Sequence, residues 1–407
     1  MSYVVFARKY RPMLFADVVG QEHITNTIKK SIMNDKLAHS YIFAGTRGVG
    51  KTTTARILAR ALNCENLNGT GQDARATESD ARTFEPCGDC ASCKSAISGS
   101  NFNIVEFDAA SNSGVADIRE LMESVNYVPA GGEGRYRVFL IDEAHSLSKQ
   151  AWNSLLKTLE EPPKNVLFIF ATTEVDKILP TILSRSIRFD FKPVSEDAIC
   201  RLLMKICDEE GVSYENEVEG MLPYPLLTIA RRGGGSVRDS LSILERVRAY
   251  GDGNITRKLV AEVLMIVPGD VFGQIVLLGY EKKTREVLDI FEKSLADGYD
   301  VDEFLDGFLS YLRDVLLSGK VKNIGDILRM AEMVANAQRE MKYSSFRRFV
   351  VERLLIKISN LDKLVTLEDL IDKTSLLVEK FEGKVSNSGI TVSYGRTGNV
   401  GRNAKNG

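Results

Sequence analysis

The stretch GTRGVGKT, Gly45–Thr52, places the strongest constraint on how this chain folds. It fits the pattern G-x-x-x-x-G-K-[ST] without deviation and lies between an apolar segment, 40–45, and a stretch with helical periodicity. In that setting the glycines let the chain turn tightly, so that backbone N–H groups converge on phosphate oxygens. A chance glycine-rich loop is the alternative, and the strand before it and the helix after it disfavour that interpretation.

The same region predicts the groups that would hold a nucleoside triphosphate. Lys51 would bring a positive charge to the β- and γ-phosphates, and the Thr52 hydroxyl would ligate Mg²⁺. The stretch RVFLIDEAH supplies Asp142, which would hold the Mg²⁺ through its water shell, and Glu143, which would polarise an attacking water. A charge cluster at a helix N-terminus is the alternative for this acidic pair. The residues expected to contact the nucleotide are Gly45, Thr46, Arg47, Gly48, Val49, Gly50, Lys51, Thr52 and Thr53.

The pattern of apolar segments predicts an α/β fold with a parallel sheet. Strands are predicted at 40–45, 103–107, 136–142 and 166–173, and helical periodicity follows each of them. From about residue 191 onward the apolar residues recur only at helical spacing. With 407 residues, more than one domain is expected. We predict a nucleotide-binding domain at 1–190, a small helical domain at 191–265, a second helical domain at 268–383 and a disordered tail at 384–407.

Four cysteines form the spacing C-x22-C-x2-C-x2-C within an insertion at about 64–100. An all-thiolate set of this kind suits tetrahedral Zn²⁺, and it leaves no open position for water, so the predicted site is structural. Four free thiols and an iron–sulfur cluster are the alternatives. The predicted ligands are Cys64, Cys87, Cys90 and Cys93, whereas the remaining cysteines, Cys200 and Cys207, are expected in a helix core.

Charge and hydropathy say less about function. Lys and Arg number 53 against 55 Asp and Glu, so the total charge of −2 does not indicate a polyanion partner. Residues 1–60 are nevertheless locally basic. No apolar stretch approaches the roughly 18 residues of a membrane helix, and no secretory leader is recognised. A cytoplasmic protein without membrane contact is expected, in which clustered thiols more often bind metal than form disulfides.

Four further stretches narrow the class of nucleotide-binding protein. They are KYRPMLFADVVGQEHI (9–24), LLKTLEEPP (155–163), TILSRSIRF (181–189) and GSVRDSLSILE (235–245). Together with the phosphate loop and the DEAH stretch, they resemble the gamma/tau subunits of bacterial DNA polymerase III clamp loaders, which are AAA+ ATPases. The resemblance is close over about 3–265 and weaker to about 380. It implies a AAA+ parallel-sheet domain with a zinc-binding insertion, a helical lid domain and a C-terminal helical collar, in a chain of gamma length.

The resemblance also implies roles for residues that the motifs alone do not assign. Thr173 would be the sensor 1 residue near the γ-phosphate, and Arg185 the arginine finger that reaches the nucleotide of a neighbouring subunit. Arg238 would be the sensor 2 residue of the lid. The KYRP segment and Val18–Val19 would border the adenine. Arg185 can also be interpreted as a surface arginine at a helix end.

The implied function is loading of a sliding clamp onto primed DNA during replication. ATP and Mg²⁺ would be the cofactors of the reaction and Zn²⁺ a structural ion. The implied partners are the delta and delta-prime subunits, further gamma/tau copies, the beta clamp and primer–template DNA, in a hetero-oligomer. Helix starts that contain Ser111, Asn112 and Lys149 are candidates for phosphate contacts, although each residue can also be a helix cap or simply solvated. The chain would belong to a DNA-directed DNA polymerase holoenzyme without carrying a polymerase site itself.

Two other functions remain open at this point. One is a scaffold subunit that binds nucleotide without hydrolysing it, which the intact set of Lys51, Thr52, Asp142 and Glu143 argues against. The other is a different AAA+ DNA motor, such as a branch-migration helicase. The cysteine insertion and the SRS and GSVRDS stretches disfavour that second alternative.

Overall fold

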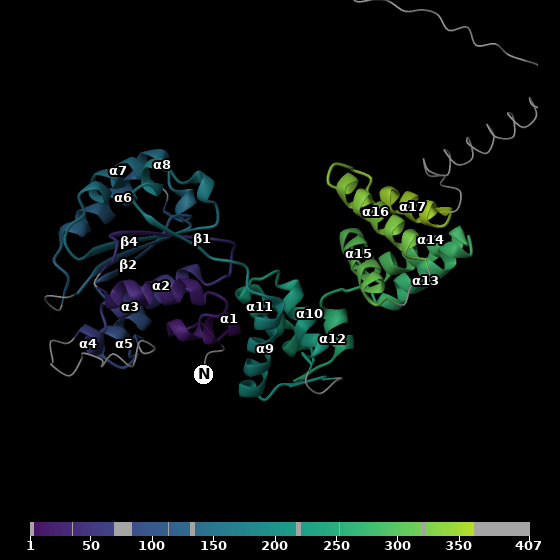
Figure 1. The fold of residues 1–407 in the computed structure, drawn as a ribbon, viewed down its shortest axis with the longest axis horizontal. Helices are drawn as coiled ribbons and strands as arrows, with labels where there is room; N and C mark the ends of the chain where they lie inside the picture. The colour runs from purple at the N-terminus through teal and green to yellow at the C-terminus, as the bar shows by residue number, and fades with distance from the viewer. Residues whose placement is uncertain are drawn as a thin grey trace, which may run out of the picture. The chain divides into compact units, whose positions relative to one another are not determined.

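The computed structural model describes residues 4–34, 36–68, 84–112, 114–130, 135–216, 221–251, 253–319 and 323–361 (Figure 1). The chain forms two compact units, Met1–Leu264 and Met265–Gly407. The predicted tail at 384–407 and the predicted helical residues 362–383 lie outside the described residues. Each unit has its own fold and is described separately.

The first unit is built on a five-stranded parallel sheet with the order β2-β3-β4-β1-β5. Its strands are β1 (Ser40–Ala44), β2 (Ile104–Asp108), β3 (Arg137–Asp142), β4 (Val166–Thr172) and β5 (Ile187–Asp190). The four strands predicted from sequence are confirmed to within a residue or two. The edge strand β5 was missed, because three of its four residues are exposed, two are charged, and it pairs only with β1.

Helices cover both faces of this sheet, which is why the inner strands are almost continuously apolar. The helices α2 (Glu22–Met33) and α3 (Lys51–Leu62) lie on one face, and α6 (Val115–Glu123), α7 (Lys149–Glu160) and α8 (Pro180–Leu183) lie on the other (Figure 1). Alternate residues of each strand supply the two cores. Leu140, Leu167 and Ile169 pack toward α2 and α3, whereas Phe139, Ile141, Phe168 and Phe170 pack toward α6 and α7.

Parallel strands bring several polar strand ends to the same edge of the sheet. Ala44, the last residue of β1, is in register with Thr172, the last residue of β4. Strand β3 ends on the same edge at Asp142, opposite Asp108 of β2. Residues that follow these strands are therefore neighbours in space, at the edge where doubly wound α/β folds bind ligands.

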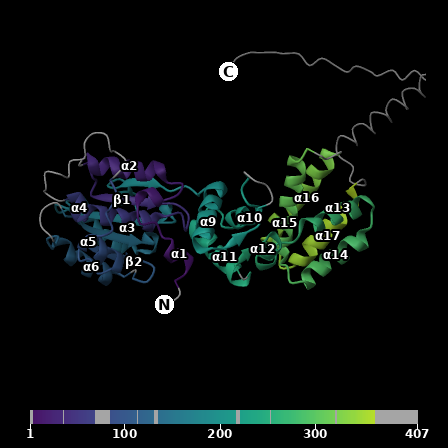
Figure 2. The same cartoon turned by 90° about the horizontal axis from the view of Figure 1, so that it is seen from below.

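Four helices complete the first unit: α9 (Glu196–Glu210), α10 (Tyr224–Arg232), α11 (Val237–Tyr250) and α12 (Arg257–Val263). Ser195, Ser236 and Thr256 cap three of them through their hydroxyl groups. Two short parallel strands, β6 (Ser213–Tyr214) and β7 (Asn254–Ile255), were not predicted. Helix α1 (Phe6–Lys9) lies against α11 (Figure 2), where Phe6 N donates to Glu245 Oε1 at 3.1 Å. That residues 191–265 form a lid domain distinct from the nucleotide-binding domain remains a prediction.

Shorter elements link these parts of the first unit. They are the helices α4 (Glu65–Asn68) and α5 (Ala91–Ser98) and the 3-10 turns η1 (Phe15–Asp17), η2 (Ser124–Asn126), η3 (Ala144–Ser146) and η4 (Val175–Lys177). Helices α3, α4 and α5 contact one another. This places the cysteine-containing segment beside the helix that begins at the phosphate loop.

The second unit is helical throughout its described residues. It contains α13 (Gly269–Tyr280), α14 (Thr284–Ala296), α15 (Val301–Leu317), α16 (Ile324–Met341) and α17 (Arg347–Ile358). Its core includes the fully buried rings of Phe272, Phe291, Phe304 and Phe308, with the centroids of Phe291 and Phe304 4.9 Å apart. Within the described ranges of both units, no helix is long and apolar enough to cross a membrane.

Candidate functional site

The phosphate loop is packed directly against the start of helix α11. A Cβ atom added to Gly48, whose φ is 77°, would lie 1.9 Å from Ser236 Oγ and 3.2 Å from Arg238 Cβ. The backbone N–H of Arg238 also points to Gly48 O at 3.5 Å. Only glycine fits at this position, because the backbone of the loop and the end of the helix are in contact.

Lys51 lies at the first position of α3, inside the loop, with 7% of its surface exposed. Its ammonium group donates to Gly45 O at 2.8 Å and Thr46 O at 2.7 Å. Burial lowers the pKa of Lys51, and the carboxylates of Asp142 and Glu143 act in the opposite direction. The charge is therefore held within the loop, and its action on the β- and γ-phosphates stays a prediction.

The two halves of the predicted triphosphate site are joined by a hydrogen bond. The Thr52 hydroxyl donates to Asp142 Oδ2 at 2.8 Å. The backbone N–H of Glu143 donates to the other oxygen, Oδ1, at 3.0 Å. These contacts bring a hydroxyl and a carboxylate together where Mg²⁺ would be ligated, which fits the preference of that ion for oxygen donors.

Glu143 has an unusual backbone conformation for a residue with a side chain. Its φ of 49° and ψ of 39° are left-handed, and the turn η3 begins directly after it. Such conformations cluster at functional sites, where the surrounding structure maintains them. The turn directs the chain so that both Asp142 and Glu143 line the same cavity.

His145, which is not among the site residues predicted from the sequence, contacts the site. The ring atom Nε2 lies 3.4 Å from Glu143 Oε2 and 3.4 Å from Glu174 Oε1. The other ring nitrogen, Nδ1, lies 3.2 Å from Thr172 Oγ1. A signal was present in the sequence, because His145 follows the acidic pair by two residues at a strand end.

Thr173 lies directly after β4 and is half-buried. It lines the cavity together with Asp142 and Glu143. The preceding residue, Thr172, is buried and accepts a hydrogen bond from Glu174 N at 3.0 Å. Thr172 thus contacts His145, whereas Thr173 lines the same cavity as the acidic pair. The sensor role of Thr173 stays a prediction.

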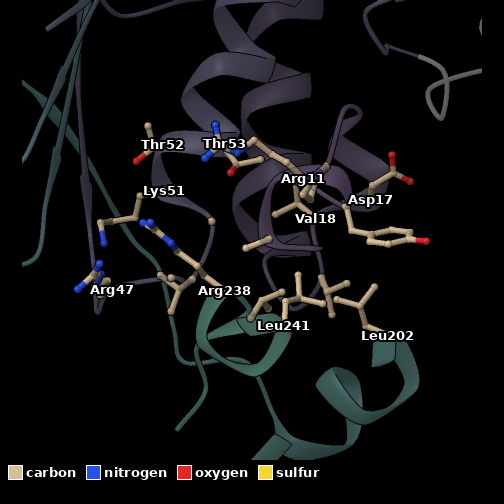
Figure 3. Close-up of a pocket in the computed structure, with 18 of the residues that line it drawn as sticks. Arg11, Asp17, Val18, Arg47, Lys51, Thr52, Thr53, Leu202, Arg238 and Leu241 are labelled. Atoms are coloured by element: carbon tan, nitrogen blue, oxygen red, sulfur yellow. The ribbon is translucent and has the colours of Figure 1, made fainter. Parts of the chain in front are cut away.

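Apart from Gly45 and Arg185, the predicted catalytic and nucleotide-contacting residues line a cavity of about 1130 Å³, which is large enough for a nucleoside triphosphate. Figure 3 shows the basic groups of Arg47, Lys51 and Arg238 gathered on one side of it. Apolar side chains of Val18, Leu202 and Leu241 gather on another side. The cavity thus has a cationic end suited to phosphates and an apolar end suited to a base. The wall also includes Tyr10, Arg11, Pro12, Val19, Thr46, Gly48, Val49, Gly50, Thr52 and Thr53.

Arg185 is the one predicted catalytic residue that the described wall of this cavity does not include. It follows α8, and its guanidinium donates to Glu160 Oε1 and Thr181 O, both at 2.8 Å. About a third of its side chain, 35%, is exposed. Within a single chain, Arg185 therefore has the contacts of a surface arginine, and its predicted action on a neighbouring subunit remains a prediction.

The four predicted cysteine ligands come together in the first unit. The Sγ atoms of Cys64, Cys87, Cys90 and Cys93 all lie within 4.8 Å of one another. Those of Cys87 and Cys93 are 3.9 Å apart, close to the roughly 3.8 Å expected for tetrahedral Zn–S bonds of about 2.3 Å. The backbone N–H groups of Cys90 and Cys93 point to the sulfurs three residues before them, at 3.4 and 3.3 Å. This donor set fits a four-coordinate metal ion.

A buried arginine beside the cluster supports the same conclusion. Arg60 of α3 is only 6% exposed, and its Nε and Nη2 atoms have no hydrogen-bond partner among the described residues. Desolvation lowers the pKa of Arg60, while the sulfurs of Cys93, Cys64 and Cys87 act to raise it. A buried cation is compensated if the thiols are deprotonated, as metal binding makes them. Cys200 and Cys207, in contrast, are buried in α9, as predicted.

The candidate DNA contacts are exposed but have local partners. Ser111 Oγ donates to Asp108 Oδ2 at 2.8 Å, and Asn112 Nδ2 donates to Asp108 O at 3.2 Å. Lys149 is the first residue of α7, which Ser148 caps. All three candidates are accessible to a ligand, and their contacts with phosphate stay predictions.

Similarity to known proteins indicates the family to which the chain belongs. The family described as "DNA polymerase III, delta subunit" matches residues 20–195. The DNA polymerase III subunit gamma of Buchnera aphidicola is 32% identical over 382 residues, covering 88% of this chain and 99% of that protein. This chain belongs to the DNA polymerase III gamma/tau family.

Other members of the DNA polymerase III gamma/tau family are longer. The tau subunit of Bacillus subtilis is 35% identical over 384 residues, which cover 88% of this chain and 63% of that protein. The tau subunit of Escherichia coli is 39% identical over 317 residues, covering 78% of this chain and 46% of that protein. The chain thus spans between about half and two thirds of these tau relatives.

A solved structure is related to the chain more distantly than these gamma/tau relatives. The RuvB Holliday junction branch migration motor of Thermotoga maritima is 17% identical, with a TM-score of 0.44. The match covers 63% of this chain and 72% of that one. A similarity this low does not indicate a shared function. The alternative of a branch-migration helicase is not favoured, because the chain belongs to the gamma/tau family.

Proposed function

We propose that this chain is an ATP-hydrolysing subunit of the DNA polymerase III clamp loader, which loads the sliding clamp onto primed DNA. The observation that carries the proposal is the convergence of Lys51, Thr52, Asp142 and Glu143 on one cavity whose wall also includes Arg238. Each of these groups has a function in phosphoryl transfer, and the chain belongs to the gamma/tau family. A scaffold without hydrolysis would have no need for the acidic pair.

Within one chain, the wall of the cavity separates the binding of phosphate from the activation of water. The loop backbone and Lys51 would bind the β- and γ-phosphates of ATP. Thr52 and Asp142 would hold Mg²⁺, which offsets negative charge on the phosphates. Glu143 would accept a proton from the attacking water, and Thr173 would orient that water. His145, whose Nε2 atom lies 3.4 Å from Glu143 Oε2, would help to position that carboxylate.

A second chain would complete the site. Arg238, from the start of α11, would contact the γ-phosphate of its own chain, while Arg185 of a neighbouring subunit would reach the same phosphate from outside. An arginine supplied in this way contributes about 10³–10⁵ to turnover in related phosphoryl-transfer enzymes. Hydrolysis would therefore depend on how the subunits pack. The further partners in this proposal are delta and delta-prime subunits, other gamma/tau copies, the beta clamp and primer–template DNA, in the cytoplasm.

In this proposal the second unit serves as the collar that joins subunits, and the polymerase activity of the holoenzyme resides in other chains. Among the described residues of this chain, the cavity wall contains only one acidic pair at a strand end, Asp142 and Glu143. The exposed Ser111, Asn112 and Lys149 would face DNA phosphates. Such contacts position a protein on DNA without reading its sequence.

The deciding experiment is reconstitution of the chain with the delta and delta-prime subunits, the beta clamp and primed circular DNA. We expect ATP hydrolysis that the clamp and primed DNA stimulate together, and clamps that stay on circular DNA through gel filtration. Hydrolysis that ignores the clamp but responds to four-way junctions would point to a branch-migration motor instead. No hydrolysis under any of these conditions would point to a scaffold.

We further propose that the cysteine cluster binds one structural Zn²⁺ per chain. Replacing Cys64 with serine is expected to remove most of the zinc, because a three-thiolate site loses one of four strong ligands. The matched control is Cys200→Ala, a buried cysteine outside the cluster, which should retain one zinc. Metal analysis of the purified chains measures both. Iron in place of zinc, or equal zinc in both variants, would contradict the assignment.

A further inference from the structure

Glu85 connects the cysteine cluster with the segment at the apolar end of the nucleotide cavity. Its Oε2 atom accepts a hydrogen bond from Phe15 N at 2.6 Å, and its Oε1 atom accepts one from Ala16 N at 3.1 Å. These N–H groups begin the 3-10 turn η1, so Glu85 caps that turn from a distant part of the chain. Only one residue separates Glu85 from Cys87, the second cysteine of the cluster.

A buried ion pair fixes the carboxylate of Glu85 in this position. The ammonium of Lys29 pairs with Glu85, and the two side chains are only 11% and 16% exposed. Lys29 Nζ also lies 5.8 Å from the centroid of the Phe15 ring, which is itself buried. Charged groups that are shielded from water have few alternative partners, so the position of Glu85 is tied to α2 on one side and to η1 on the other.

The turn that Glu85 caps is part of the cavity wall. Ala16, Asp17 and Val18 line the cavity at and just after η1. Val18 is 4% exposed, and its Cγ1 atom would lie 3.6 Å from a Cβ added to Gly50. Val18 therefore spans the space between the turn and the phosphate loop, and a displacement of η1 would displace the wall of the cavity.

Arg60 provides a second connection between the same two regions. It lies beside the sulfurs of the cluster, and its Nη1 atom donates to Met13 Sδ at 3.7 Å. Met13 also lines the cavity. Two side chains near the cysteine cluster, the carboxylate of Glu85 and the guanidinium of Arg60, thus each contact residues 13–18.

We propose that Glu85 is a positioning residue for nucleotide binding, and that metal binding by the four cysteines sets the apolar wall of the nucleotide cavity through it. This inference rests on the proposed function, since it requires that a nucleotide occupies the cavity. A metal ion would hold Cys87, and with it Glu85, at the distance from η1 that the two hydrogen bonds require. Loss of either the ion or the carboxylate would loosen residues 13–18 and weaken nucleotide binding. The catalytic groups at the other end of the cavity would be unaffected.

The first test is Glu85→Gln in the full-length chain, titrated with a fluorescent ATP analogue in the presence of Mg²⁺. Glutamine keeps one acceptor oxygen, so we expect the variant chain to fold and to retain one zinc. The Kd for the nucleotide should rise by about tenfold, which corresponds to the loss of one charge-assisted contact. In the reconstituted complex, KM for ATP should rise by a similar factor with kcat nearly unchanged. The matched control is Glu262→Gln, an exposed carboxylate on α12 that pairs only weakly with Lys258.

Two further arms separate positioning from a general loss of stability. The double variant Glu85→Gln, Lys29→Met leaves no buried charge unpaired. Its Kd for the nucleotide should still be higher than that of the parent chain, because the cap on η1 is still weakened. Removing the metal with a zinc-selective chelator should raise the Kd of the parent chain toward that of Glu85→Gln and change the variant little. Hydrogen exchange at residues 13–18 should quicken in both cases.

The outcomes distinguish this inference from the function on which it rests. If the parent chain binds the analogue and Glu85→Gln binds it equally well, the positioning role is wrong and the proposed function stands. If metal removal and Glu85→Gln weaken binding independently of each other, the connection between them is wrong. If the parent chain fails to bind nucleotide at all, the proposed function itself is overturned.

Discussion

Replacing Arg185 with alanine is expected to lower the kcat of the reconstituted complex by about 10³-fold or more, which is the low end of what an arginine supplied by a neighbouring subunit contributes. Nucleotide binding to the mutated chain itself should change little, because Arg185 is outside the described wall of its own cavity. Folding should also be preserved, since the ion pair with Glu160 is partly exposed and such pairs contribute about 0–1 kcal/mol. Steady-state phosphate release and equilibrium binding of an ATP analogue measure the two quantities.

The matched control for Arg185 is Arg231→Ala. Arg231 also lies at a helix end in an exposed ion pair, with Glu196 at 2.9 Å, but it belongs to α10. Its loss should leave kcat within about twofold of the parent, as expected for an exposed pair. If both variants turn over at the parent rate, Arg185 is a surface arginine and no second chain completes the site through it.

Replacing Glu143 with glutamine is expected to lower kcat by about 10²–10⁴-fold, the range that a positioned general base contributes. The amide keeps the size of the side chain but accepts no proton from water. Binding of ATP should remain or become tighter, because a negative charge near the γ-phosphate is removed while Lys51 and Thr52 remain in place. Single-turnover hydrolysis and nucleotide binding by the same purified complex measure both.

Glu262→Gln serves as the control for this change, since it removes one exposed carboxylate outside the described cavity wall. It should hydrolyse ATP at the parent rate. Equal and measurable turnover in the parent chain and in Glu143→Gln would show that another group accepts the proton, and His145, 3.4 Å from Glu143, would then be the first residue to test.

Much of the fold and of the candidate site could be predicted because it depends on patterns of residues that are close together in the sequence. The phosphate loop needs glycine, lysine and threonine at fixed spacing, so the sequence alone placed Lys51 and Thr52. The inner strands β1, β3 and β4 are covered on both faces and read as apolar runs. Strand β5 was missed because an edge strand needs only one partner and shows little apolar pattern.

The contacts that sequence reasoning did not find depend on residues far apart in the chain. Glu85 lies 70 positions from Phe15, and the bond between them follows from where α3 and the cysteine segment lie. His145 was not among the predicted site residues, and two partners of its ring, Glu174 and Thr172, come from another strand end. Arg185 shows the opposite case. Its predicted role rests on family resemblance, and its contacts within one chain are those of an ordinary surface arginine.

The close contact between Gly48 and the start of α11 has a mechanical consequence. A Cβ at position 48 would lie only 1.9 Å from Ser236 Oγ, so even a methyl group there would clash with that hydroxyl. We expect the Ser236 hydroxyl, which caps α11, to be displaced first, and the start of α11, from which Arg238 extends, to be loosened with it. A single hydrogen atom in place of a side chain thus lets the phosphate loop and the start of α11 stay in contact, and alanine at this one position is expected to disturb that contact without altering any charged group.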